Sequence, residues 1–117
     1  MTDRPIAKRD FQFGTEAPGQ SVKLEICQAR RDAVGDWTAL IRITGLPSGP
    51  IEQTAHGVDS VQATQLALVL AGTYLYTSGK APGAHVFRQV PNDDLGLPVT
   101  EPLRELVERR DPANSQS

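Results

Sequence analysis

Apolar and polar residues alternate along much of the first half of the chain, with a period of two that is typical of β-strands with one buried face. Over residues 22–27, aliphatic side chains alternate with Lys23, Glu25 and Cys27, which predicts a half-buried strand. Further strands are predicted over residues 8–14, 37–44 and 51–56. The mixed polarity of residues 51–56 predicts that this strand lies at a sheet edge. Segments rich in glycine, proline and aspartate separate these strands, so we expect an antiparallel meander.

The apolar period changes from two to about 3.6 residues at Gly57, which predicts one long helix over residues 58–77. Asp59 and Ser60 can satisfy free N–H groups of the first turn as helix N-cap residues, and Gln62 can return a hydrogen bond to the capping residue. The apolar residues of this helix span more than half of its circumference, which is broader than one small sheet would cover. We therefore expect the helix to be wrapped by the C-terminal segment or buried in a subunit contact.

The last third of the chain carries weaker signals. Residues 85–89 could form a fifth strand, and Thr100 could cap a short terminal helix with an aliphatic stripe. The polar segments 1–7 and 111–117 are expected to be flexible tails. The chain is thus predicted to be a single α+β domain over residues 8–110. Its mainly antiparallel, three- to five-stranded sheet should have the long helix packed on one face and the short C-terminal helix at its rim.

Charge and composition narrow the function classes. Lysine and arginine number 12 against 14 acidic residues, and the net charge of -2 offers no general attraction to nucleic acid or anionic lipid. No apolar run approaches the ~20 residues that cross a bilayer, and residues 1–10 lack the apolar core of a secretory signal. The single cysteine, Cys27, agrees with a reducing compartment. We therefore expect a cytoplasmic protein that binds neither nucleic acid nor a membrane.

Catalytic and metal-binding chemistry has little support in the sequence. Cys27, His56 and His85 are single and far apart, so they lack the spacing of metal ligands. No serine lies in a nucleophile elbow of the Gly-x-Ser-x-Gly type, which disfavours a Ser-His-Asp hydrolase. We expect no metal, no cofactor and no catalytic residues, and the sequence favours a binding role over an enzymatic one.

The segment from Gly57 to Leu68 resembles the site at which acyl and peptidyl carrier proteins receive a phosphopantetheine arm on serine. The modified residue in this chain would be Ser60, which follows Asp59 at the start of the predicted helix. The carrier family is an all-helical bundle, whereas the residues before Gly57 alternate with the period of strands. A carrier-like protein modified on Ser60 is therefore a remote alternative to a simple capping role.

Several motifs together resemble a family of small, uncharacterised bacterial domains in which a tryptophan-containing strand is followed by this helix. The motifs are Asp36-Trp37, Ile41-Arg-Ile-Thr-Gly45, Gly57-Val-Asp-Ser-x-Gln-Ala63, Gln65-Leu-Ala-Leu68 and Asp94-Leu-Gly-x-Pro98. The resemblance covers most of residues 8–110 and implies a bacterial, cytosolic protein. That family has no assigned activity, so the resemblance supplies no catalytic residues.

Two classes of function stay open. The favoured hypothesis is a non-enzymatic protein–protein interaction module, an adaptor or an immunity-type partner, which could also form a homodimer through its helix or an edge strand. The alternative is a small-molecule or anion-binding protein, or a minor enzyme, with a pocket between sheet and helix. The side chains expected to line such a pocket and give it polarity are Trp37, Arg42, His56, Gln62, Tyr74 and Tyr76.

Overall fold

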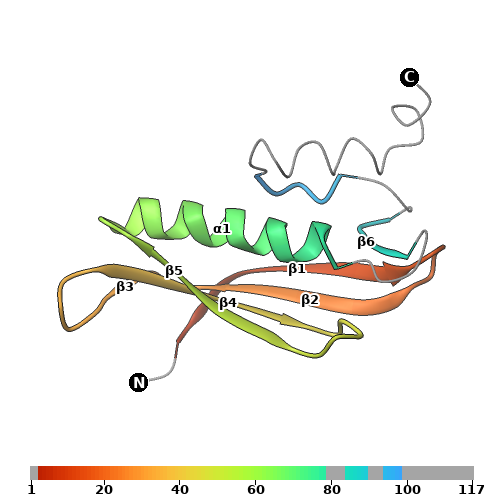
Figure 1. The fold of residues 1–117 in the computed structure, drawn as a ribbon, viewed down its shortest axis with the longest axis horizontal. Coiled ribbons are helices and arrows are strands. Elements are labelled where there is room, and N and C mark those ends of the chain that lie inside the picture. The colour runs from red at the N-terminus through yellow and green to blue at the C-terminus, as the bar shows by residue number, and fades with distance from the viewer. Residues whose placement is uncertain (1–2, 79–83, 90–93, 99–117) are drawn as a thin grey trace.

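The computed structural model of the chain describes residues 3–78, 84–89 and 94–98. Within these residues, one helix, α1 (Ser60–Tyr76), lies across one face of an antiparallel β-sheet (Figure 1). The strands are β1 (Pro5–Gly14), β2 (Gln20–Cys27), β3 (Arg30–Arg31), β4 (Trp37–Thr44), β5 (Ile51–Gly57) and β6 (His85–Phe87). The α+β class and the antiparallel sheet covered by a long helix are therefore confirmed.

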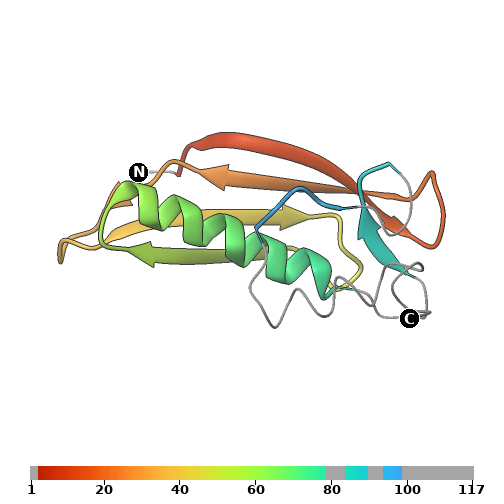
Figure 2. The same ribbon diagram turned by 90° about the horizontal axis from the view of Figure 1, so that it is seen from above.

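The strands pair mainly with their neighbours in the sequence, and the helix connects β5 to the last strand. β5 pairs along one edge of β4, while β2 and then β3 pair in succession along its other edge. β1 pairs on the free edge of β2, and β6 adds to β1 after the helix has crossed the sheet (Figure 2). Among the described residues, β3, β5 and β6 each pair with a single strand and lie at an edge, so the edge position predicted for residues 51–56 is confirmed.

The sheet differs from the expectation in its strand number and in some boundaries. Within residues 3–78, 84–89 and 94–98 it has six strands, more than the three to five expected. The additional strand, β3, is two exposed arginines long and has no alternation that could mark it. β1 starts at Pro5, inside the segment predicted as a tail, because Pro5 is already paired with β2. β6 ends at Phe87, short of residue 89. The predicted terminal helix and the tail over residues 111–117 lie outside the described residues.

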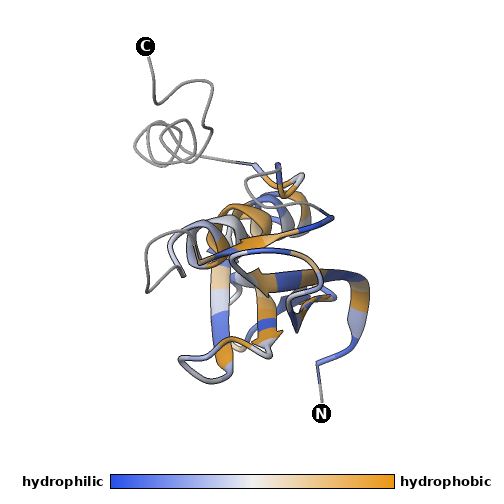
Figure 3. Ribbon diagram, turned by 90° about the vertical axis from the view of Figure 1, so that its right-hand side faces the viewer, coloured by the Kyte–Doolittle hydropathy of each residue, from blue (hydrophilic) through white to orange (hydrophobic). Residues whose placement is uncertain are grey.

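The register gives the sheet two different faces. Residues directly opposite each other in an antiparallel pair point to the same side, and the pairs Leu24↔Ile43 and Ile26↔Ile41 lie on the side of α1. None of these four side chains is more than 2% exposed. The helix meets this inner face with its smallest side chains, which are Ala63, Ala67 and Ala71. Figure 3 shows the helix along this side of the sheet, with hydrophobic and hydrophilic positions alternating along the strands.

A row of alternating charges crosses the outer face of the sheet. The register places Lys8, Glu25, Arg42 and Glu52 opposite one another on β1, β2, β4 and β5. Lys8 Nζ lies 3.7 Å from Glu25 Oε2, and Arg42 Nε lies 3.3 Å from Glu52 Oε2. Such solvated pairs add little stability, but they show that this face is built to contact water.

The start of α1 is capped by side chains from its first turn. Asp59 is the N-cap residue, and its Oδ1 accepts a 2.8 Å hydrogen bond from the backbone N–H of Gln62. The Gln62 side chain accepts from the N–H of Val58 at 2.7 Å, one residue before the position that the capping motif predicts. Ser60 is the first helical residue, one position after the N-cap, and its carbonyl accepts a 2.7 Å bond from Thr64 Oγ1.

Residues 94–98 form a segment, called the strap here, that packs on the C-terminal half of α1. Tyr76 Oη donates to Asp94 Oδ1 at 3.0 Å and accepts from the backbone N–H of Leu95 at 2.9 Å. Leu95 is fully buried. A Cβ added to Gly72 would lie 2.9 Å from a strap carbonyl, so glycine allows this close approach. The strap thus covers the end of the helix and leaves its beginning open.

Candidate functional site

An open, mainly apolar groove lies beside the first two turns of α1, between the helix and the N-terminal ends of β1 and β4. Its volume is about 560 Å³. We call it the Trp37 groove, and its lining residues are Ile6, Gln28, Ala29, Trp37, Ser60, Val61, Thr64 and Gln65.

Trp37 lies in this groove because of its place in the sheet. It is the first residue of β4, on the helix side, directly opposite Gly57 of β5. A Cβ on Gly57 would lie 2.5 Å from the backbone nitrogen of Ala63, so glycine lets the first turn of α1 approach this end of the sheet. Trp37 is half-buried, whereas Ile6 is 56% and Val61 64% exposed. The groove therefore presents aliphatic and aromatic surface that the described part of the chain leaves uncovered.

A second, smaller cavity of about 230 Å³ lies between α1, the inner face of β1 and β2, and the strap. Its walls are largely aliphatic, and at its edge lies Arg9, an exposed cation on the helix side of β1, so we call it the Arg9 cavity. Its lining residues are Ala7, Lys8, Arg9, Leu24, Ile26, Leu68, Gly96, Leu97 and Pro98.

Arg9 reaches this cavity from the apolar face of β1, where it is paired with the buried Leu24. Its Nη1 donates to the carbonyls of Leu95 and Gly96, at 2.9 and 3.2 Å, and so ties the strap to the sheet. No carboxylate among the described residues lies within ion-pair distance of the guanidinium. The nearby charge is also positive, since a Cβ on Gly96 would lie 2.6 Å from Arg9 Nη1 and 3.3 Å from Arg88 Nη1.

The structure does not bring the six predicted pocket residues together. Trp37 is in the groove, but the register places Arg42 and His56 on the outer face of the sheet, away from the helix. Gln62 is used in the helix cap. The two tyrosines lie further along α1, where Tyr74 is half-buried and Tyr76 is buried under the strap. The six residues therefore do not together line a single pocket between the sheet and the helix.

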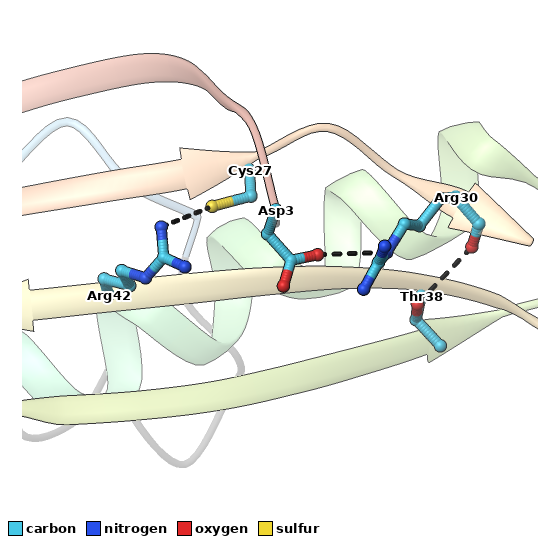
Figure 4. A network of polar contacts seen from close by, with 5 residues as sticks. All are labelled: Asp3, Cys27, Arg30, Thr38 and Arg42. Carbon is cyan, nitrogen blue, oxygen red and sulfur yellow. Dashed lines mark hydrogen bonds and ion pairs between the residues drawn. The ribbon is translucent and has the colours of Figure 1, made fainter. Parts of the chain in front are cut away.

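Cys27 and Arg42 form a polar contact at the outer face (Figure 4). Arg42 Nη1 lies 3.6 Å from Cys27 Sγ, next to an ion pair of 3.0 Å between Asp3 and Arg30. Burial raises the pKa of the Cys27 thiol, and the neighbouring Arg42 offsets only part of that rise. The thiol is fully buried and protonated at neutral pH, which makes it a poor nucleophile and a poor metal ligand.

Sequence reasoning missed the residues that define both cavities. Arg9 shares its period-two face with Phe11 and Phe13, and a cation on an otherwise apolar face was a signal that could have marked the site. Ile6 and Val61 carried no such signal, because exposure of a single aliphatic residue depends on which segments cover it.

Three further observations on the described residues concern metal binding, the membrane and the carrier-like motif. They contain no group of three or more histidine, cysteine, aspartate or glutamate side chains that could hold a metal ion. Their one helix is too short or too polar to pass through a lipid bilayer. Ser60, the residue of the carrier-like motif, lines the Trp37 groove at the start of α1.

Comparisons with known proteins identify the family of this domain but assign it no activity. No curated protein and no solved structure matches the chain. A family model described as a domain of unknown function, DUF6968, matches residues 7–99, which include the helix and all of the described strands except the first two residues of β1. The chain therefore belongs to the DUF6968 family of uncharacterised domains.

Proposed function

We propose that this domain is a non-enzymatic protein–protein interaction module that binds another protein at the Trp37 groove, as an adaptor or an immunity-type partner. The observation that carries this proposal is the uncovered apolar surface of Ile6, Trp37 and Val61 at one end of the domain. Exposed apolar surface of this kind, rimmed by polar side chains, is typical of protein interaction sites. The fully buried, protonated Cys27 also suits a reducing compartment, and we infer a cytoplasmic place of action.

The composition of the groove fits the energetics of protein recognition. Tryptophan is enriched among the residues that contribute most to binding, and such residues lie in pockets that exclude water. Trp37 is held by the strand on one side and by the first turn of α1 on the other, so little entropy is lost when a partner covers it. Gln28, Thr64 and Gln65 supply hydrogen-bonding groups at the rim.

Val61→Asp is expected to weaken partner binding by about 30-fold or more, because it places a charge in the apolar contact. The matched control is Val34→Asp, since Val34 is 84% exposed in the turn between β3 and β4 and is absent from the groove lining. The wild-type domain and both variants would be used as baits in the native host with quantitative mass spectrometry. The partner should be retained by the wild-type domain and the V34D variant and lost by V61D.

Direct titration separates true binding from a folding defect. Trp37 is the only tryptophan, so its fluorescence should change when the purified partner covers the groove. V61D must keep the wild-type melting temperature within a few degrees. Retention of the same partner by V61D, or binding without any change in Trp37 emission, would refute the groove as the binding site.

A second function, binding of a small organic anion, is favoured by one specific observation. Arg9 lies at an aliphatic cavity of about 230 Å³ and has no carboxylate partner in the described part of the chain. A guanidinium binds carboxylates well, and the aliphatic walls would accept a hydrocarbon chain. The ligand class that fits both features is a short- or medium-chain carboxylic acid.

Arg9→Met is expected to abolish any stabilisation of the domain by such acids, since it keeps the aliphatic stem and removes the charge. Thermal melts would be recorded with a series of straight-chain acids from butanoate to decanoate. The control variant is Lys23→Met, which removes an exposed cation from the outer face. A rise in melting temperature shared by the wild type and K23M but absent in R9M supports the site. No rise in the wild-type protein rejects it.

A further inference from the structure

The outer edge of β5 is an open pairing surface. β5 pairs with β4 in one continuous register, from Trp37↔Gly57 to Ile43↔Ile51, without a bulge. In the described part of the chain, no hydrogen bond satisfies the backbone groups of residues 52–56 on the other edge, and β5 contains neither proline nor lysine. Natural proteins normally protect such an edge, because unpaired N–H and C=O groups are a template for another strand.

We propose that the occupant of this edge is a second copy of the chain, paired β5 to β5 in antiparallel orientation about a two-fold axis at Thr54. This register overlaps all of β5 and joins the two sheets into one. It goes beyond the proposed function, because it uses the flank of the domain opposite the Trp37 groove and leaves that groove open.

Side-chain complementarity selects this register. With Thr54 opposite its own copy, Glu52 of each chain lies directly opposite His56 of the other, so two acid–imidazole pairs form across the axis. Both residues are exposed and point to the outer face, because His56 is paired with Thr38 and Glu52 with Arg42. A threonine pair at the axis is also favourable between neighbouring strands. Shifting the register by two residues on either side removes both acid–imidazole pairs and shortens the ladder.

The helix adds apolar surface on the same flank. Val61 faces the groove near β1, and at 100° per residue Leu66 and Leu70 lie on the opposite side of the helix, toward β5. Leu66 is 42% exposed and Leu70 is half-buried. A two-fold axis perpendicular to the sheet puts both α1 helices on the same face, side by side and antiparallel. These leucines would then be buried between the helices, which explains an apolar arc wider than one sheet covers.

The test is the mass of the full chain in solution, followed by sedimentation over a range of concentrations. The wild-type protein should reach twice the chain mass of 12.7 kDa. His56→Glu sets two glutamates opposite two others across the axis and should raise the dimer dissociation constant more than about tenfold. Thr44→Glu is the control, because it adds a carboxylate to the outer face of the interior strand β4 and should leave the dimer intact.

A cysteine variant tests the register independently of charge. Facing residues at a two-fold axis of an antiparallel pair have Cα atoms about 4.5–5.5 Å apart, within the span of a disulfide. Oxidation with diamide should therefore link Thr54→Cys chains into a covalent dimer, whereas Thr44→Cys chains should stay single. A wild-type protein of single-chain mass at millimolar concentration, or a dimer that H56E leaves intact and T54C fails to link, would overturn the proposal. Neither result bears on partner binding at the Trp37 groove.

Discussion

Gly45→Ala is expected to lower the free energy of unfolding by more than about 3 kcal/mol, a large share of the stability of a domain of this size. Gly45 follows β4 with φ at +98°, a left-handed conformation that costs a residue with a side chain about 1–2 kcal/mol. Its added Cβ would also collide with the carbonyl oxygen of Ser21 and lie 3.1 Å from Val22 Cα. These are backbone atoms of β2, so they cannot rotate away, and the pairing of β2 with β4 must shift.

The variant Gly49→Ala separates the cost of the left-handed backbone from the cost of the collision with β2. Gly49 has a similar φ of +103°, but its added Cβ would meet nothing within 4 Å. This variant should therefore lose only the backbone term of about 1–2 kcal/mol. Urea unfolding of both variants, followed by Trp37 fluorescence, gives the comparison. Equal losses at the two positions would mean that β2 is not held against the end of β4 as described.

The alternation of side chains predicted the strands best where one face is fully buried. β4 was predicted at its observed limits, Trp37 to Thr44, because burial of every second residue leaves a clear pattern. β3 had no such pattern, since both of its arginines are exposed, and its pairing with β4 follows only from the register of the adjoining hairpin. The pairing of β6 with β1 also could not be read from the sequence, because it joins segments at opposite ends of the domain.

The candidate site was harder to predict than the fold, for a related reason. Because side chains alternate between the two faces of a strand, Arg42 and His56 point away from the face that carries the inward residues of their strands. The same alternation places them on the opposite face from Trp37. A pocket that combined them with the helix was thus inconsistent with the strand pattern. The Arg9 cavity depends on how the strap crosses the helix and reaches β1, and such contacts between distant segments leave no local period.

The broad apolar arc of α1 is covered in one half of the helix and left exposed in the other. The C-terminal half is covered by the strap, where Gly72 and Tyr76 are buried. The N-terminal half keeps Val61 and Leu66 exposed on opposite flanks of the helix. The first of these faces the Trp37 groove and the second the β5 side, so the two proposed contacts use different parts of the same excess surface.

Ile41→Ala is expected to destabilise the domain by about 3–4 kcal/mol, whereas Leu40→Ala should cost about 1 kcal/mol or less. Ile41 is fully buried on the inner face, where it lies opposite Ile26 and beneath α1, so truncation leaves a cavity that the sheet cannot close. Leu40 precedes it but points to the outer face opposite Thr54, where water can fill the space left by truncation.

This neighbouring pair tests the central feature of the fold, because the two variants delete similar side chains from adjacent positions of one strand. Chemical unfolding should show unchanged cooperativity for both and a lower midpoint mainly for I41A. Similar losses at the two positions would require both faces of β4 to be covered, and the open outer face would then be wrong. A larger loss of stability for Leu40→Ala than for Ile41→Ala would mean that the other face of β4 is the buried one. The placement of Trp37 beside the helix and of Thr54 at an exposed edge would then also be wrong.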